Sequence, residues 1–477
     1  MRRFIALGVV LVVTGFRPIH SQSPSLTPHQ RFAREIYREL VEINTTDDSS
    51  GSNTKAAEAM AARFRAAGFP AADVQVLVPP GRPTKGNLVV RYRGRAGSTM
   101  KPIMLLAHLD VVAARREEWP RDPFTLHEEG GYFLGRGTSD DKAMAAAFVA
   151  NLLRMKREGI VPDRDLLLAL TADEEGGAPP NGVEWLIANH RSLIDAAYAI
   201  NEGGGGTLAG DKPIFHSVQA AEKVPVHYTV TVTNPGGHSS VPRPDNAIYA
   251  LADALGRIAR APFPVALNAV TRDFFAQTAK VEPDTALAAA MRAITMRPGD
   301  AAAAAVLARD PRYNSMMRTT CVATRIAGGH ANNALPQTAT ANVNCRIVPT
   351  SNAAEVLATL NRIVGDTAVK IAWTGNLNER FGAAPEIVDS ALLAATTDLT
   401  RRMFGDIPVI PTMSTGATDG RFLRAAGIRT YGVSGIFGVP GENNAHGRDE
   451  KLRVKSFYDG VEFLDALVRR LTGAPRM

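Results

Sequence analysis

Apolar residues recur at helical spacing in the first part of the chain. In residues 28–42 the apolar positions Phe32, Ile36 and Leu40 repeat every fourth residue, and residues 55–67 continue the same pattern. A stripe of this period places the apolar side chains on one face of a helix. We therefore predict two amphipathic helices in these segments.

Further along, short apolar runs alternate with helical segments. The runs indicate strands at 74–78, 88–92, 103–107 and 165–171, and the segments indicate helices at 143–156 and 183–190. Such alternation is typical of α/β folds, in which helices flank a buried sheet. We predict an α/β fold with a central, mostly parallel sheet.

The pattern changes near residue 223. Residues 224–233 alternate polar and apolar positions, as a half-exposed strand does. Later elements of this region are strands at 319–326 and 338–347, helices at 246–258 and 353–364, and further helices in the alanine-rich stretch 286–308. We predict a separate α+β domain inserted at residues 223–380.

The α/β pattern returns after this insertion. It comprises a helix at 388–404, a Gly/Thr-rich loop at 414–420, a strand at 429–433 and a helix at 454–471. One α/β domain in two parts, residues 28–222 and 381–477, is the simplest organisation. The length of 477 residues agrees with more than one domain.

The N-terminus has the layout of a secretory signal peptide. Arg2 and Arg3 precede an apolar run at residues 4–16, which a polar, proline-broken stretch follows. We predict that residues 1–22 are a signal peptide and that the protein is secreted or periplasmic. The apolar run is too short to span a bilayer comfortably. Because no clean Ala-x-Ala cleavage site is visible, a short buried helix or an uncleaved, membrane-tethering anchor stays an alternative.

Composition and charge exclude other classes. With 45% hydrophobic and 21% charged residues, the chain is not disordered, collagen-like or a coiled coil. The net charge of +7 raises the question of a polyanionic partner. Three arginines and no acid lie in residues 1–22, so the charge after their removal falls by three to +4. Because no Lys/Arg block remains, we expect no nucleic-acid partner.

The chain has two cysteines, Cys321 and Cys345, both in strand-like runs. The sequence leaves open whether they form a disulfide, because it does not give the distance between them. Since there is no Cys-x-x-Cys pattern, a bound metal would need histidine and carboxylate ligands.

Histidines and acids follow several of the predicted strands. His108 and Asp110 follow the strand at 103–107, and Asp140 ends the glycine-rich approach Gly-Arg-Gly-Thr-Ser. The carboxyl ends of parallel strands are the usual place for a site in open α/β folds. Taken alone, a His-x-Asp pair is more often structural, and acids at a helix N-terminus often act only as caps.

Two further acidic motifs and a distant histidine complete the set. Glu174 and Glu175 follow the strand at 165–171. Glu202 follows the apolar run at 196–200 and precedes four glycines, and His446 lies in the returning α/β segment. Contiguous carboxylates at the end of a buried strand repel one another, and a divalent cation would offset that cost. A solvated acidic turn is the alternative for Glu174 and Glu175.

In their order along the chain, these motifs resemble the dinuclear zinc exopeptidase family of aminoacylase, carboxypeptidase G, carboxypeptidase S, acetylornithine deacetylase and succinyl-diaminopimelate desuccinylase. The resemblance covers nearly the whole chain after the leader. The run Asp140-Asp141-Lys142 and the segment at 271–275 look most like the carboxypeptidase S and aminoacylase branch. The resemblance to this family implies that the inserted domain is a lid through which the protein forms a homodimer.

The resemblance also implies a ligand set for two Zn²⁺ ions, with Co²⁺ or Mn²⁺ as possible substitutes. Asp140 would bridge the two ions. His108 and Glu202 would be the other protein ligands of one ion, and Glu175 and His446 would be those of the second ion. Three carboxylates against two Zn²⁺ ions leave about one positive charge, which stabilises a bound hydroxide.

Further roles follow from the same resemblance. Asp110 would orient His108, and Glu174 would be the general base. His238, in a Gly-His-Ser turn, would reach the site of the partner subunit and polarise the scissile carbonyl. Its alternative is an exposed turn histidine.

The substrate's free carboxylate would be bound by Asn333 and Arg346, because an Arg fork matches a carboxylate. The loop around Gly416 and Thr418 would line the same cleft. For Arg346 a surface ion pair is the alternative. Pro179 and Pro180 after Glu175, and the glycines after Glu202, depart from the family's pattern.

We expect a secreted zinc-dependent hydrolase that cleaves the amide bond of a C-terminal peptide residue or of an N-acyl amino acid. Two other functions stay open. One is a peptide- or amino-acid-binding protein that has lost turnover, against which the intact Glu174 argues. The other is an aminopeptidase of a related zinc fold, which requires a free substrate amine.

Overall fold

The computed structural model describes residues 25–176, 179–374, 385 and 387–474 of the chain. The signal peptide predicted for residues 1–22 lies outside the described residues. The domain boundary predicted at residues 380 and 381 lies outside them as well. No helix in the described ranges is long and apolar enough to cross a membrane.

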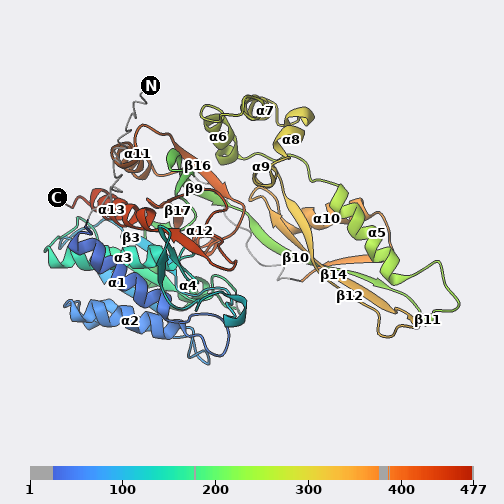
Figure 1. The fold of residues 1–477 in the computed structure, drawn as a ribbon, viewed down its shortest axis with the longest axis horizontal. Helices are drawn as coiled ribbons and strands as arrows, with labels where there is room; N and C mark the ends of the chain where they lie inside the picture. Colours follow the sequence, from blue (N-terminus) through green and yellow to red (C-terminus); the bar gives the residue numbers. More distant parts are fainter. Residues whose placement is uncertain (1–24, 177–178, 375–384, 386, 475–477) are drawn as a thin grey trace, which may run out of the picture.

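A ten-stranded sheet forms the centre of the larger part of the molecule (Figure 1). Its strand order is β1-β2-β6-β3-β7-β17-β9-β8-β18, and β16 pairs with β9. The strands are β1 (Val74–Leu77), β2 (Asn87–Tyr92), β3 (Ile103–His108), β6 (Leu166–Thr171), β7 (Tyr198–Asn201), β8 (Gly206–Ala209), β9 (Lys212–Glu222), β16 (Val409–Ser414), β17 (Arg429–Gly432) and β18 (Phe437–Gly438). Neighbouring strands β6, β3, β7 and β17 are all parallel. The predicted α/β fold with a mostly parallel sheet is confirmed.

Helices cover both faces of this sheet because successive strand residues point to opposite sides. In β3, Leu105 packs with one set of helices, whereas Met104 and Leu106 pack with another. The first set is α1 (Pro28–Glu42), α2 (Asn53–Ala66), α3 (Lys142–Arg157), α11 (Ser390–Phe404) and α13 (Val454–Leu471). The second set is α4 (Gly182–Ile194) and α12 (Gly420–Ala425). A buried strand therefore reads as a continuous apolar run, as the sequence showed.

A second, antiparallel sheet extends away from the first (Figure 1). Its order is β12-β14-β10-β15, from β10 (Val224–Thr233), β12 (Thr320–Gly328), β14 (Thr338–Ile347) and β15 (Val369–Trp373). Helices α5 (Ala247–Arg260) and α10 (Ala353–Val364) pack on one face. We call this sheet and its two helices the lid. At its far end, β11 (Gly237–His238) pairs with β13 (Ala334–Leu335).

Four helices between α5 and β12 form a cluster that packs on the large sheet through α6. They are α6 (Ala269–Thr278), α7 (Thr285–Met296), α8 (Ala301–Leu307) and α9 (Pro311–Met317). Phe275 of α6 and Met291 of α7 share a hydrophobic cluster with Ile410 of β16. The alanine-rich stretch is thus helical, as predicted, and it belongs to the hydrophobic cluster beside β16, not to the core of the lid.

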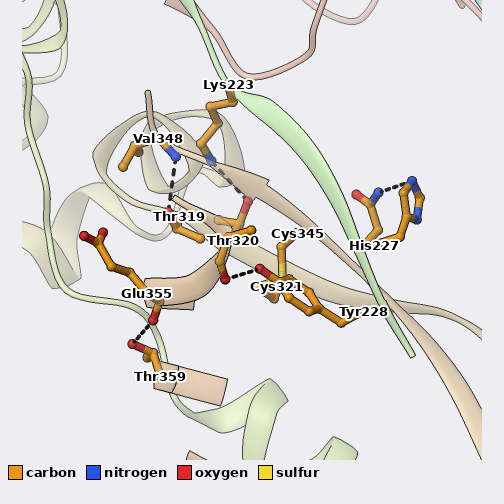
Figure 2. The surroundings of a disulfide bond; sticks show 12 residues. Lys223, His227, Tyr228, Thr319, Thr320, Cys321, Cys345, Val348, Glu355 and Thr359 are labelled. Atoms are coloured by element: carbon orange, nitrogen blue, oxygen red, sulfur yellow. Dashed lines mark hydrogen bonds between the residues drawn. A yellow bond between two sulfur atoms is a disulfide. The ribbon is translucent and has the colours of Figure 1, made fainter. Parts of the chain in front are cut away.

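A disulfide joins Cys321 and Cys345 (Figure 2). The two residues lie directly opposite each other on the antiparallel strands β12 and β14, with their Cα atoms 4.0 Å apart. The strand register therefore supplies the distance that the sequence did not give.

Several strands were not predicted from the sequence. They are β9 and β16, the short strands β8, β15 and β18, the lid pair β11 and β13, and a small sheet of β4 (His127–Glu129), β5 (Tyr132–Leu134) and β19 (Lys451–Arg453). In β9 the buried polar residues His216, Gln219 and Glu222 interrupt the apolar pattern. The predicted loop at 414–420 begins at the last residue of β16.

Buried His216 makes folding stability depend on pH. Its Nδ1 contacts Thr400 Oγ1 at 2.8 Å, and burial lowers its pKa to about 4. Between pH 6.5 and about 4 the unfolded chain binds a proton that the folded chain does not, so this histidine's contribution is present above pH 6.5 and is lost as the pH falls towards 4. We expect a loss of up to about 3 kcal/mol, at about 1.4 kcal/mol for each pH unit.

The measurement is the free energy of unfolding in urea between pH 7 and 4.5. His216→Gln is expected to flatten its slope against pH, whereas His330→Gln, at an exposed position, keeps the wild-type slope. Equal slopes for wild type and His216→Gln would contradict this assignment.

Candidate metal centre

Three neighbouring strands bring the predicted ligands to one edge of the large sheet. His108 is the last residue of β3, Glu174 and Glu175 follow β6, and Glu202 follows β7. Because these strands are parallel and adjacent in the order β6-β3-β7, their carboxyl ends meet. Residues far apart in the sequence therefore share one site.

Asp140 lies between two histidines. Its Oδ1 is 3.0 Å from His108 Nε2, and its Oδ2 is 3.2 Å from His446 Nε2. Each carboxylate oxygen thus faces a different imidazole. A carboxylate placed in this way can act as a ligand to two metal ions.

Each histidine also faces a second carboxylate. His108 Nε2 is 3.8 Å from Glu202 Oε1, and His446 Nε2 is 2.9 Å from Glu175 Oε2. Ligand atoms of His108, Glu174 and Glu202 lie within 4.8 Å of one another, and so do those of His108, Asp140 and Glu175. The five predicted ligand residues and Glu174 therefore lie together at one site, and His108 belongs to both of these groups.

The electrostatics of the site show what holds these charges together. Burial raises the pKa of both Glu174 and Glu202 well above the ordinary value. Burial acts in the same direction on Asp140, but hydrogen bonds with His108 and His446 outweigh it and lower its pKa. Hydrogen bonds to Asp140 and Glu175 raise the pKa of His446 to about 10. Positive charge is needed here to keep the acids ionised.

This donor set fits divalent metal ions. It offers imidazole nitrogens and carboxylate oxygens without sulfur, a combination that suits Zn²⁺ and also Mn²⁺ or Co²⁺. Two divalent cations would supply the positive charge that the buried acids need. The side chain of His446 is 56% exposed, so the site is open to solvent on that side.

Asp110 positions the loop that carries the two glutamates. Its carboxylate accepts hydrogen bonds from the backbone N–H groups of Glu174 and Glu175, at 3.1 and 2.9 Å. Its backbone carbonyl oxygen is 3.0 Å from His108 Nδ1, whereas the carboxylate is 3.7 Å away. Burial raises the pKa of Asp110 to about 7. The residue contacts His108 chiefly through its backbone.

Glu450 is a residue that sequence reasoning missed. Its Oε1 accepts hydrogen bonds from the backbone N–H groups of Ser139 and Asp140, at 2.8 and 3.1 Å, and its Oε2 is 2.7 Å from Arg136 Nη1. It thereby fixes the glycine-rich loop that presents Asp140. It lies 310 residues from Asp140 in the chain and belongs to no motif.

Removing the Glu450 carboxylate is expected to destabilise the protein strongly. Glu450→Ala would leave the Arg136 guanidinium, 3% exposed, without its ion pair. Breaking a buried ion pair costs about 3–5 kcal/mol. Glu129→Ala, at the 68% exposed end of a surface pair with Arg121, is expected to change the free energy of unfolding far less. Free energies of unfolding test this, and equal losses in the two variants would refute the anchoring role.

The loop around Thr418 is anchored from within the protein. Thr418 Oγ1 donates to Glu222 Oε2 at 2.9 Å, and the backbone N–H of Gly416 donates to Ser414 Oγ at 3.1 Å. Asp419 is buried and accepts hydrogen bonds from Thr171 and Asn181, at 2.6 and 2.7 Å. The Thr418 hydroxyl is thus already engaged by the protein.

The predicted residues of the inserted domain lie at opposite ends of the lid. His238 pairs with Ala334 across β11 and β13, next to Asn333, and Figure 1 places β11 at the far end of the lid. Arg346 lies near the other end of β14, which begins at Thr338. A strand rises about 3.3 Å per residue, so Thr338 and Arg346 are roughly 25 Å apart. Asn333 and Arg346 therefore do not meet within one chain in this conformation.

A family model described as peptidase family M20/M25/M40 matches residues 104–470. The curated relatives include a probable carboxypeptidase S-like 2 of Dictyostelium discoideum, 28% identical over 80% of this chain and 74% of its own. They also include the human N-fatty-acyl-amino acid synthase/hydrolase PM20D1, 28% identical over 78% of this chain and 74% of its own. Among solved structures, the M20 family metallo-carboxypeptidase Sso-CP2 from Sulfolobus solfataricus matches with a TM-score of 0.68 and 18% identity, covering 92% of this chain and 98% of its own.

Proposed function

The chain belongs to peptidase family M20/M25/M40, and from this premise we propose that it is a zinc-dependent hydrolase of C-terminal peptide residues or N-acyl amino acids. That it is a metallopeptidase or amidohydrolase follows from the family and its relatives. The names of those relatives include a carboxypeptidase and an N-fatty-acyl-amino acid hydrolase. The observation that carries the proposal is the position of Asp140 between His108 and His446.

In this proposal, His108 and Glu202 hold one ion, Glu175 and His446 hold the other, and Asp140 is shared. When bound, two Zn²⁺ ions supply Lewis-acid activation of water and of the amide carbonyl. The contacts of each histidine with Asp140 and one glutamate support this division of ligands.

Glu174 is the proposed general base. It takes a proton from the attacking water and returns it to the leaving amine. Two observations support this role. Its carboxylate lies with His108 and Glu202, and its backbone N–H is held by Asp110. Burial raises the pKa of Glu174, which makes its carboxylate a stronger proton acceptor.

Arg346 is the proposed binding group for the substrate's free carboxylate. Arg346 is half-buried on the open face of the lid sheet, and burial lowers its pKa, while the nearby carboxylate of Glu174 acts in the opposite direction. Gly416 and Thr418 are proposed to shape the cleft through the anchored loop.

His238 and Asn333 are proposed to act on the site of a partner subunit, with His238 donating a hydrogen bond to the scissile carbonyl oxygen. Their position at the far end of their own lid supports this. The edge strand β12 supports pairing of two lids, because it exposes Val322 at 58% and Ile326 at 67%.

Export through a signal peptide at residues 1–22 is part of the proposal. The Cys321–Cys345 disulfide supports it, because such bonds persist in oxidising compartments. The N-terminal sequence of the protein recovered from the extracellular or periplasmic fraction tests it. A mature chain that still begins at Met1 would refute cleavage.

The test of the function is hydrolysis by the metal-loaded mature protein of three substrate classes. These are peptides with a free C-terminus, the same peptides amidated, and N-acyl amino acids. We expect cleavage of the first or third class and little cleavage of amidated peptides. Preference for substrates with a free amine, irrespective of the C-terminus, would favour an aminopeptidase. Binding without cleavage would favour a protein that has lost turnover.

A further inference from the structure

A buried lysine occupies the junction between the large sheet and the lid. Lys223 follows the last residue of β9 and precedes β10, and its side chain is fully buried. Its backbone N–H donates to Ser414 O at 3.0 Å. Its ammonium donates to Thr320 Oγ1 at 3.2 Å, as Figure 2 shows.

The Lys223 ammonium lies beside Arg346. Thr320 of β12 is directly opposite Arg346 of β14, so their side chains point to the same face of the lid sheet. That face is the one without helices, because neighbouring Cys345 and Ile347 point into the lid core. Burial and, after it, the positive charge of Arg346 together lower the pKa of Lys223 to about 7.

These two cations lack an acidic partner among the described residues. The Arg346 guanidinium forms no ion pair there, and the Lys223 ammonium has only the Thr320 hydroxyl. The nearest acid in sequence, Glu222, is already bound to Thr418 and to Arg424, the latter at 2.8 Å. Buried charges are normally paired, because an isolated one loses its hydration. A bound anion would therefore stabilise the protonated Lys223 beside Arg346, because neither has a carboxylate partner among the described residues.

The same place borders the metal centre. The carboxylate of Glu174 and the guanidinium of Arg421 both influence the pKa of Arg346, after burial, which lowers it. Arg421 adds a third positive charge, with its guanidinium over the Phe422 ring at 4.4 Å. The Arg346 guanidinium is therefore within electrostatic range of the proposed base, Glu174.

We propose that Lys223 is a specificity-determining residue that binds, together with Arg346, the free carboxylate of the substrate. This inference rests on the proposed function, which supplies a substrate with a free carboxylate. It gives Arg346 a partner in its own chain, whereas Asn333 lies at the far end of the lid.

The test measures binding in the metal-loaded Glu174→Gln background, in which turnover is blocked. The ligands are the N-acyl amino acid that the wild-type enzyme cleaves fastest and its carboxamide, titrated by calorimetry. Lys223→Met is expected to weaken binding of the free acid about 10- to 100-fold, as loss of one charge-assisted hydrogen bond does. Binding of the carboxamide is expected to change less than about threefold.

Two further variants separate the effect of the Lys223 positive charge from that of its hydrogen bond with Thr320. Thr320→Val removes the hydrogen bond but keeps the ammonium, and it is expected to preserve the preference for the free acid. Lys223→Gln keeps a donor towards Thr320 but removes the charge, and it is expected to behave as Lys223→Met does. The inference would be overturned if the Lys223 variants bound the free acid and the carboxamide more weakly by the same factor. It would also be overturned if they kept the wild-type preference for the free acid.

This failure is distinguishable from failure of the proposed function. If the wild-type enzyme cleaves neither peptides nor N-acyl amino acids, the function itself is wrong. If it cleaves them and Lys223→Met keeps the preference for the free acid, only the role of Lys223 is wrong.

Discussion

Glu174→Gln is expected to lower kcat by about 10²- to 10⁴-fold while the protein still binds two metal ions per chain. A glutamine side chain has nearly the same shape as a glutamate side chain. The substitution also keeps the backbone hydrogen bond from residue 174 to the Asp110 carboxylate, at 3.1 Å. It does not take up the proton of the attacking water, so general base and general acid catalysis are lost together. The measurement is kcat on the best substrate, with metal content determined by elemental analysis of the same sample.

The adjacent glutamate is the matched control. Glu175 contacts His446 Nε2 at 2.9 Å, so Glu175→Gln is expected to lose activity together with one metal ion. The two neighbouring variants thus differ in metal content and not in the change of charge. Full activity in Glu174→Gln would remove Glu174 from the proposed mechanism.

Asp140→Asn is expected to have the second large effect. The two oxygens of Asp140 face His108 and His446, and an asparagine has only one oxygen to offer. We expect fewer than two metal ions per chain and a fall in kcat/KM of at least about 10³-fold, equivalent to about 4 kcal/mol of transition-state stabilisation.

Metal content and kcat/KM measured side by side test this. The control is Asp195→Asn, at a surface pair with Lys101 where the carboxylate side chain is 39% exposed; it is expected to keep both values. Two bound ions and unchanged activity in Asp140→Asn would show that the carboxylate is not shared.

Local patterns predicted most elements of the fold. The helices expected at 454–471 and 353–364 and the strands expected at 224–233 and 338–347 have those bounds in the structure. Their periodicity is set by one buried face, which the sequence displays directly. In β9, by contrast, buried His216 is satisfied by Thr400 and Ser434 from distant segments, so its burial has no local signal.

The residues of the site likewise include some that local sequence patterns predict and some that they do not. His108, Glu175 and Glu202 were predictable as a group because each follows an apolar strand, and parallel strand ends meet at one edge. Glu450 was not, because a lone glutamate becomes an anchor only once the fold carries it to the Asp140 loop. The separation of Asn333 from Arg346 depends on the length of β14 between them, which motif order does not convey.

The most direct measurement is the return of metal to the chelated protein, followed by hydrolysis of an N-acyl amino acid or a C-terminally free peptide. The shared position of Asp140 between His108 and His446 predicts no activity without metal and a rise that ends at two equivalents of Zn²⁺ per chain. Full activity in the metal-free protein, or a rise that is complete at one equivalent, would contradict it.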